Sequence, residues 1–203
     1  MINKTLTELN VSRETFEKLS VYVDELIKWN EKINLISTDS AEDLWKRHVL
    51  DAVQLKVFFN KDQRIVDLGS GNGIPGVVLS ALGFEVTLVE KSLKKTQFLR
   101  KIKSLLSLKL DIINSRVEEL NLKRVKYVTC RGFDKIVNVI NLTENLFYDE
   151  IIYVLPKGAS YKDEIVEAQK KYLFEYKCFG SVTSSSSKII VLNCNDKRNN
   201  SFS

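Results

Sequence analysis

The segment 66-VDLGSGNGIPG-76 constrains the fold more than any other part of the chain. It places four glycines, an acid and a proline within eleven residues, and it continues the run 64-RIVDL-68, which is typical of a short buried strand. Glycines at this spacing let the backbone turn tightly and approach a ligand closely. The segment therefore predicts a strand, a ligand-binding turn and a helix, which together begin a βαβ unit.

The rest of the chain continues this alternation of strand and helix. Parallel strands are expected at 64–68, 84–90, 109–112, 125–130 and 150–155, with helices that begin at Pro75 or span 93–107, about 134–146 and about 161–171. The segments 172–179 and 188–194, joined by 180-GSVTSSSS-187, should add an antiparallel hairpin. These elements predict an α/β, Rossmann-like fold with a seven-stranded mixed sheet and helices on both faces.

Two helices are expected ahead of the sheet. The first is amphipathic and runs from Ser12, a typical N-cap residue, to about Lys32. The second begins at Asp39, which forms a capping-box pattern with Glu42, and ends near Val57. We therefore predict one structural domain, with a helical N-terminal extension at 1–60, the sheet and its helices at 61–194, and a disordered polar tail at 195–203.

The glycine segment fits two nucleotide cofactors. From Gly71 it is the dinucleotide fingerprint G-x-G-x-x-G, with Glu90 placed 19 residues later for a ribose. Counted from Asp67, the segment is D-x-G-x-G-x-G, and Gly69 makes the turn after the strand. Counted from Gly69, the third glycine of the dinucleotide fingerprint would fall on Ile74, which does not fit that fingerprint. The first interpretation favours an NAD-dependent oxidoreductase, and the second favours an S-adenosylmethionine-dependent methyltransferase. A P-loop is excluded, because no lysine followed by Ser or Thr closes the motif.

The second interpretation explains more of the chain, including the terminal hairpin. The glycines would leave room for the methionine part of the cofactor, and amides at the helix N-terminus would favour its carboxylate. Asp67 would support the loop or meet the α-ammonium, and Glu90 would accept hydrogen bonds from the ribose. We therefore predict S-adenosylmethionine as the cofactor.

Composition narrows the cellular setting. The net charge of +5, from 31 basic and 26 acidic residues, permits a polyanionic partner. The cysteines Cys130, Cys178 and Cys194 form no C-x-x-C pair, which argues against a disulfide framework or a structural zinc site, and no metal is predicted. No apolar run approaches the ~18 residues of a membrane span, and the N-terminus lacks a secretory h-region. A cytoplasmic enzyme with no membrane partner is expected.

The methyl acceptor is constrained mainly by what the sequence lacks. A Pro-Pro-aromatic signature of exocyclic amine methylation does not occur, and Cys130 lacks the Pro-Cys context of cytosine C5 chemistry, so a buried hydrophobe is its better interpretation. Guanine N7 carries its own lone pair and needs no base, so alignment of the reacting atoms suffices.

Basic residues point to RNA as the carrier of this acceptor. Six of them lie between 91 and 103 without an acid: Lys91, Lys94, Lys95, Arg100, Lys101 and Lys103. Arg131 follows the fourth strand, where ligands of open α/β sheets bind, and it could hold a phosphate or the cofactor carboxylate. The alternative for the basic run is a solvated helix face, and the alternative for Arg131 is a surface salt bridge. His48, on the face Leu44–His48–Ala52–Leu55, is by position alone best interpreted as a packed core histidine.

Together these motifs resemble the bacterial 16S rRNA guanine-N7 methyltransferases of the RsmG family, also called glucose-inhibited division protein B (GidB). The matching segments are 29-WNEKINL-35, 47-RHVLDAV-53, 66-VDLGSGNGIPG-76, 115-SRVEEL-120, 131-RGF-133 and 155-LPKG-158. The chain departs from the family at Ile36, where Thr is usual, and at 130-CRGF-133, where S-R-A-F is usual. These departures affect the expected substrate contacts and leave the cofactor segment intact.

The resemblance implies a class I S-adenosylmethionine-dependent methyltransferase, acting as a monomer on the guanine numbered 527 in the reference 16S rRNA of the small ribosomal subunit. It implies that Gly69 and Ile74 border the cofactor and that Val117 and Glu118 flank the adenine. It also implies that Arg131 is a binding-site residue and that Asn34 and His48 lie near the cofactor or substrate entrance, and these three residues are the candidates for a catalytic role. The predicted cofactor site is Asp67, Gly69, Ser70, Gly71, Gly73, Ile74, Glu90, Val117, Glu118 and Arg131. The predicted RNA-binding residues are Lys91, Lys94, Lys95, Arg100 and Arg131. A non-catalytic RNA-binding protein with a vestigial loop is a further alternative, which the intact Asp67, glycines and Glu90 disfavour.

Overall fold

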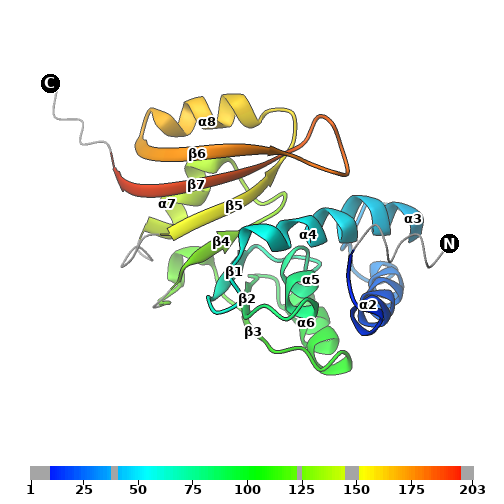
Figure 1. The fold of residues 1–203 in the computed structure, drawn as a ribbon. Helices are drawn as coiled ribbons and strands as arrows, with labels where there is room; N and C mark the ends of the chain where they lie inside the picture. Colours follow the sequence, from blue (N-terminus) through cyan, green and yellow to red (C-terminus); the bar gives the residue numbers. More distant parts are fainter. Residues whose placement is uncertain (1–9, 38–40, 123–124, 145–150, 198–203) are drawn as a thin grey trace, which may run out of the picture.

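The computed structural model describes residues 10–37, 41–122, 125–144 and 151–197, and it contains one seven-stranded mixed sheet with helices on both faces (Figure 1). The strand order is β3-β2-β1-β4-β5-β7-β6. The first five strands are parallel, while β7 pairs antiparallel with both β5 and β6. The predicted fold class is confirmed. The strands are β1 (Ile65–Leu68), β2 (Val86–Val89), β3 (Leu110–Ile113), β4 (Tyr127–Thr129), β5 (Ile151–Lys157), β6 (Tyr172–Gly180) and β7 (Lys188–Lys197).

The central strands are buried on both faces. All residues of β1, β2 and β4 are buried, which matches their continuous runs of apolar and β-branched residues. One face carries α2 (Arg13–Asn30), α5 (Gly76–Ala81) and α6 (Leu93–Leu105), and the other carries α7 (Ile136–Thr143) and α8 (Tyr161–Gln169) (Figure 1). The carboxyl ends of β1, β2 and β4 thus lie at one edge, where the following loops converge.

The N-terminal helices pack into the same core as the sheet. Ser12 caps α2 by accepting a hydrogen bond from the Thr15 amide, as predicted. Leu19 and Leu26 of α2 are fully buried in a cluster that also contains Val77 of α5 and Phe98 of α6. Burial of this apolar face, rather than helix propensity, holds the extension against the sheet.

The second N-terminal helix is less regular than predicted. It consists of α3 (Ala41–Leu44), a π-helical turn (Trp45–Leu50), α4 (Asp51–Val53) and a 3₁₀ turn (Gln54–Phe58); the expected cap at Asp39 lies outside the described residues. A π turn has i→i+5 hydrogen bonds and so holds one more residue than an α-helical turn, and such turns are frequent at functional sites. Leu44, Ala52 and Leu55 are buried as expected, but His48, inside the π turn, is only half-buried. The prediction of a packed core histidine is therefore wrong.

The C-terminal prediction also needs a correction. Strand β7 continues to Lys197, which lies opposite Tyr172 of β6. Residues 195–197, assigned to a disordered tail, therefore belong to the sheet: Asp196 and Lys197 pair with β6, and Asn195 lies at a register shift between paired residues. Residues 198–203 lie outside the described residues. Within the described ranges, no helix has the length and apolar character needed to cross a membrane.

Candidate active site

A cleft of about 400 Å³ opens at the carboxyl ends of β1, β2 and β4. Four residues predicted to bind the cofactor line it (Gly69, Glu90, Val117 and Glu118), together with Lys91 and Lys95 from the predicted RNA-binding set. Sequence reasoning did not assign a role to several further lining residues: Val89, Ser115, Arg116, Gly132, Phe133, Asp134 and Leu142. Most of these follow β3 or β4, so the rule that ligands bind beyond strand ends was the signal that could have found them.

The glycine loop requires its glycines for two different reasons. Gly69 has φ +62°, and a Cβ there would lie 2.2 Å from Cδ2 of Phe133, so only glycine lets this ring pack over the end of β1. Gly71 also has a positive φ, +53°, but a Cβ there would have space, its nearest neighbour being the Gly69 carbonyl oxygen at 3.6 Å. Ser70 is buried and donates to the Asp67 carbonyl, so it stabilises the loop from within.

Glu90 fixes the position of the glycine loop against the end of β2. Its side chain accepts hydrogen bonds from the Gly71 amide at 2.9 Å and from the Ser92 amide at 2.7 Å, one on each oxygen. The residue is 6% exposed and lines the cleft. Each carboxylate oxygen has a second lone pair, so Glu90 can accept hydrogen bonds from a ribose while it holds the loop.

Asp67 lies beneath the loop rather than in the cleft. One of its oxygens, Oδ2, accepts a hydrogen bond from the Gly76 amide at 3.1 Å, and the residue is fully buried. Its other oxygen, Oδ1, has no hydrogen-bond partner among the described residues. Burial raises the pKa of this carboxyl to about 7, and the hydrogen bond from Gly76 only partly offsets it. Of its two predicted roles, the structure shows loop support.

The start of α5 does not offer the expected free amides. The Gly76 amide donates to Asp67, and the Val77 amide donates to the Gly73 carbonyl oxygen at 2.6 Å. Both groups are therefore engaged within the protein, and the prediction that the helix N-terminus binds a carboxylate is not supported at these two positions. Gly73 packs against Val77 and Leu99, and Ile74 is buried, so neither lines the cleft.

The wall predicted to receive the adenine is built from a short turn. Val117 and Glu118 lie in a 3₁₀ turn after β3, and Leu142 of α7 completes this side of the cleft. The Glu119 carboxylate accepts hydrogen bonds from the Ser115 hydroxyl and the Arg116 amide, which fixes the turn. Apolar side chains beside a carboxylate suit a flat base with polar edges.

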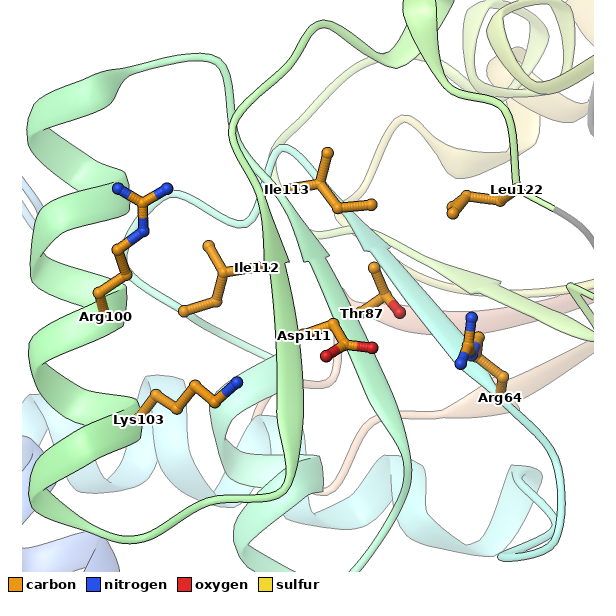
Figure 2. Close-up of a pocket in the computed structure, with 8 residues that line it drawn as sticks. All are labelled: Arg64, Thr87, Arg100, Lys103, Asp111, Ile112, Ile113 and Leu122. Atoms are coloured by element: carbon orange, nitrogen blue, oxygen red, sulfur yellow. The ribbon is translucent and has the colours of Figure 1, made fainter.

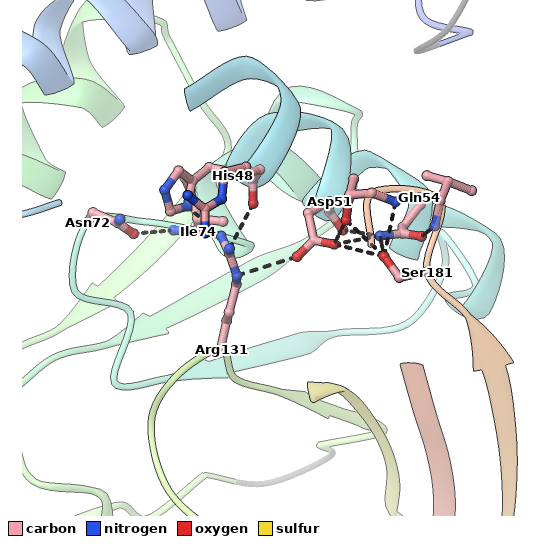
Figure 3. A network of polar contacts seen from close by, with 10 residues as sticks. His48, Asp51, Gln54, Asn72, Ile74, Arg131 and Ser181 are labelled. Atoms are coloured by element: carbon pink, nitrogen blue, oxygen red, sulfur yellow. Dashed lines mark hydrogen bonds and ion pairs between the residues drawn. The ribbon is translucent and has the colours of Figure 1, made fainter. Parts of the chain in front are cut away.

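Arg131 lines a second pocket rather than the cofactor cleft, and its side chain joins the end of β4 to the second N-terminal helix (Figure 3). Its guanidinium lies 2.6 Å from Nδ1 of His48 through Nη1, donates to the Arg47 carbonyl oxygen at 2.7 Å through Nη2, and lies 3.4 Å from Oδ2 of Asp51 through Nε. Arg131 is therefore not among the residues that line the cofactor cleft. The neighbouring Gly132 and Phe133 line the cleft in its place.

The contact with Arg131 determines the protonation state of His48. A guanidinium only donates hydrogen bonds, so Nδ1 of His48 must accept, and the ring proton must reside on Nε2. Burial, and then the positive charges of Arg131 and Arg47, lower the pKa of His48 to about 4. His48 is therefore a neutral imidazole near pH 7, and its basic nitrogen is already occupied.

The remaining predicted catalytic candidates are not brought into the cleft. Cys130 is buried, and its burial raises the thiol pKa to about 12, which confirms its interpretation as a small hydrophobe rather than a nucleophile. Asn34 is exposed and lines neither the cleft nor the pocket that contains Arg131. Its neighbour Leu35 accepts a hydrogen bond from Asn72 of the glycine loop.

The predicted RNA-binding residues divide between surfaces. Lys91 and Lys95 lie at the cleft, and Lys94 is exposed on α6. Arg100 instead lines a separate pocket of about 420 Å³ at the edge strand β3, where Lys103 lies on the same side of the strand and Arg64 on the opposite side (Figure 2). The basic run is therefore not one continuous patch.

Comparisons with known proteins agree with this geometry. The profile of the GidB family, described as rRNA small subunit methyltransferase G, matches residues 15–193. A relative named "Ribosomal RNA small subunit methyltransferase G" from Rickettsia bellii is 41% identical over 184 residues, which cover 90% of this chain and 95% of the relative. A protein of the same name from Rickettsia prowazekii is 38% identical over 187 residues, with 91% and 97% coverage.

A solved structure shows the same fold. A TehB-like SAM-dependent methyltransferase from Corynebacterium glutamicum superposes with a TM-score of 0.56 at 14% identity, over 71% of this chain and 87% of that one. At such low identity the likeness concerns the fold alone, whereas the sequence relatives extend over nearly the whole chain. The glycine loop and the Glu90 carboxylate at the end of β2 form a cofactor site of the expected kind. Because the family profile also matches residues 15–193, the chain belongs to the GidB family of small-subunit rRNA methyltransferases.

Proposed function

We propose that the protein transfers a methyl group from S-adenosylmethionine to N7 of the guanine numbered 527 in the reference 16S rRNA, acting as a monomer in the cytoplasm on the small ribosomal subunit. The observation that carries the proposal is the cofactor cleft in a chain whose nearby histidine and cysteine are both unavailable for proton transfer or nucleophilic attack. His48 has its basic nitrogen bonded to Arg131, and Cys130 is buried with a raised pKa. An acceptor with its own lone pair fits such a site, because it has no proton to lose.

The cleft residues fit S-adenosylmethionine. Glu90 would accept hydrogen bonds from the ribose, and Val117 and Leu142 would enclose the adenine. The buried Asp67 lies under the loop that would hold the methionine part, and it supports that loop by accepting a hydrogen bond from the Gly76 amide. When bound, S-adenosylmethionine supplies an electrophilic methyl group on a sulfonium. The protein residues then only need to hold the cofactor and to align the acceptor in line with it.

The neutral state of His48 also suits N7 chemistry. Methylation at N7 leaves a positive charge on the guanine, and a neighbouring imidazolium would oppose that charge. Burial and the positive charge of Arg131 lower the pKa of His48, so the imidazole is neutral near pH 7 and adds no positive charge to this region. Arg131 itself is balanced by Asp51.

The proposal is tested by methyl transfer. Isolated small subunits and deproteinised 16S rRNA, both lacking the modification, are incubated with the protein and S-adenosylmethionine carrying a labelled methyl group, and the labelled nucleotide is mapped. We expect N7-methylguanine at the guanine numbered 527 on at least one of these substrates. Label at another base or atom would contradict the acceptor assignment.

A binding comparison separates the alternatives. Calorimetry with S-adenosylmethionine and with NAD should detect only the first ligand, whereas binding of NAD alone would favour the oxidoreductase. Binding of RNA without any methyl transfer would favour the vestigial RNA-binding protein. Light scattering tests the monomer.

A further inference from the structure

The serine-rich loop between β6 and β7 has no role in the proposed chemistry, yet it lies beside Arg131. Residues 181-SVTSSSS-187 face the second N-terminal helix across a pocket of about 540 Å³. We call this the hydroxyl pocket. It is lined by loop hydroxyls from Thr183, Ser184, Ser186 and Ser187. The basic residues Lys46, Arg47 and Arg131 form the rest of the wall, together with Asp43 and Asp51.

Asp51 holds the loop in place. Its Oδ1 accepts hydrogen bonds from the Thr183 hydroxyl at 2.7 Å, from the Ser181 hydroxyl at 3.3 Å and from the Gln54 amide at 2.7 Å (Figure 3). Gln54 in turn accepts a hydrogen bond from the Val182 amide at 2.9 Å. The loop is therefore fixed at its first three residues, and the Asp51 carboxylate is already bonded to two loop hydroxyls and paired with Arg131.

The remaining residues of the loop present donors to the pocket. Ser184 and Ser186 lie 3.0 Å apart through their hydroxyl oxygens, and Ser187 lies beside them in the lining. Opposite these hydroxyls, Lys46 and Arg47 are exposed, and neither forms an ion pair with another residue in the described part of the chain. Hydroxyls that face a lysine and an arginine provide the donor types that proteins use most often for phosphate oxygens.

The hydroxyl pocket is continuous with the cofactor cleft along the chain. Arg131 lines the hydroxyl pocket, and the next two residues, Gly132 and Phe133, line the cleft. A nucleotide whose base reaches the cleft would therefore have its neighbouring phosphates within reach of the pocket. An arrangement in which phosphate contacts position the strand and the base enters a separate site is common in nucleic-acid recognition.

We propose that the hydroxyl pocket binds the phosphodiester backbone of the RNA substrate next to the target base. This inference rests on the proposed function for the identity of the RNA, but it assigns a separate site with its own residues. The loop hydroxyls donate hydrogen bonds to phosphate oxygens, and Lys46 and Arg47 supply the positive charge. Asp51 positions the loop and contacts no phosphate.

The test compares two sets of variants with matched controls. The first set is the triple change Ser184→Ala, Ser186→Ala and Ser187→Ala, and the second is Lys46→Ala with Arg47→Ala. The controls are Ser104→Ala and Lys170→Ala, which are exposed on α6 and just after α8, away from the pocket. Affinity for 16S rRNA and for isolated small subunits is measured at several salt concentrations, and cofactor affinity is measured by calorimetry.

The triple serine variant should bind RNA at least about tenfold more weakly, since three hydrogen bonds from hydroxyl groups to phosphate oxygens are lost. The Lys46 and Arg47 double variant should lower the slope of log affinity against log salt by about 1.5, because two phosphate contacts disappear. Both variants should show a raised KM for RNA with kcat unchanged within about twofold, and S-adenosylmethionine should bind as it does to the wild type. Lys46→Arg should keep most of the affinity.

Two results would overturn the inference. One is RNA affinity and salt slope equal to those of the controls. The other is ultraviolet crosslinking of loop residues 181–187 to a ribosomal protein and not to RNA in the complex with small subunits, which would assign the pocket to a protein partner. Failure of the proposed function would give a different result from failure of this inference. In that case the wild-type protein would transfer no methyl group, but the pocket variants would still bind RNA more weakly than the controls.

Discussion

The cofactor cleft and the hydroxyl pocket lie on either side of the segment Arg131–Phe133, yet they are built in opposite ways. The cleft is formed from turns that directly follow β1, β2, β3 and β4, and backbone amides of the glycine loop and of Ser92 are held by one carboxylate, Glu90. The hydroxyl pocket joins residues 43–51 with 183–187, and side-chain hydrogen bonds hold it together. One site is a product of local chain geometry, and the other depends on contacts between distant segments.

The two sites also differ in charge. The cleft wall is balanced in charge, with the acids Glu90, Glu118 and Asp134 against the basic residues Lys91, Lys95 and Arg116. In the hydroxyl pocket, three basic side chains outnumber two acids, and Asp51 is already bonded. Neutral His48 contacts Arg131, which lines the hydroxyl pocket. The excess of basic residues therefore distinguishes the hydroxyl pocket, which we propose for the RNA backbone, from the balanced cleft proposed for the cofactor.

Substitution of Gly71 by Asp should have the largest effect of the four changes, and it should act on the cofactor cleft alone. The positive φ of Gly71 strains any L-residue, and the new carboxylate would lie beside Glu90, whose side chain accepts a hydrogen bond from the Gly71 amide. We expect cofactor binding to fall by more than about 100-fold, which is over 2.7 kcal/mol, because two carboxylates would compete for one place. Calorimetry measures it. Gly180→Asp, where a Cβ has no neighbour within 4 Å, is the control, and wild-type affinity in Gly71→Asp would contradict the role of the loop.

Glu90→Gln removes the charge from the cleft while it keeps the size of the side chain. The variant loses charge-assisted hydrogen bonds to the loop and to the ribose, so cofactor affinity should drop by about 30-fold, or about 2 kcal/mol. Isothermal titration at fixed salt tests this. Glu85→Gln removes an exposed carboxylate that pairs with Arg64 before β2 and should change affinity less than twofold. Equal effects of the two substitutions would mean that Glu90 contributes nothing specific.

Asp51→Asn should affect the other region alone. It weakens the contacts to Arg131, Ser181 and Thr183, and we expect the free energy of unfolding to fall by about 1–2 kcal/mol, with faster hydrogen exchange in 181–187. Urea denaturation and exchange mass spectrometry provide the measurements. Asp62→Asn, at an exposed position, serves as the control. A large loss of cofactor affinity in Asp51→Asn would show that the two regions are coupled more strongly than the contacts suggest.

His48→Gln should have the smallest effect, visible as a change in pH dependence. The pKa of His48 is about 4 in the folded protein and near 6.5 when unfolded, so the unfolded chain binds a proton first as the pH falls. The wild type should lose stability between pH 6.5 and 4, and the variant should lose about 1 kcal/mol less, a figure discounted because the ring is only half-buried. Unfolding free energies at pH 5 and 7.5 test this, and parallel pH profiles would count against it.

Much of the fold and half of the site were predictable because they follow from local patterns. The alternation of β-branched runs and amphipathic stretches predicted the sheet, and the spacing from Gly69 to Glu90 placed both residues at the cleft. The errors occurred where distant partners decide. Arg131 was expected at the cofactor because it follows β4, but Asp51 and His48, some 80 residues earlier, draw its side chain to the other side.

The sequence by itself determined the alternation of strands and helices, the glycine turn and the carboxylate at the end of β2, because each depends on neighbours along the chain; the order of the strands in the sheet came from the structure. Only the tertiary structure decided the environment of the side chains beside that turn. It set the tautomer of His48, the direction of Arg131, the burial of Asp67 and the meeting of the serine loop with the second helix. These depend on desolvation and on hydrogen bonds across more than 100 residues of sequence, which no local pattern records.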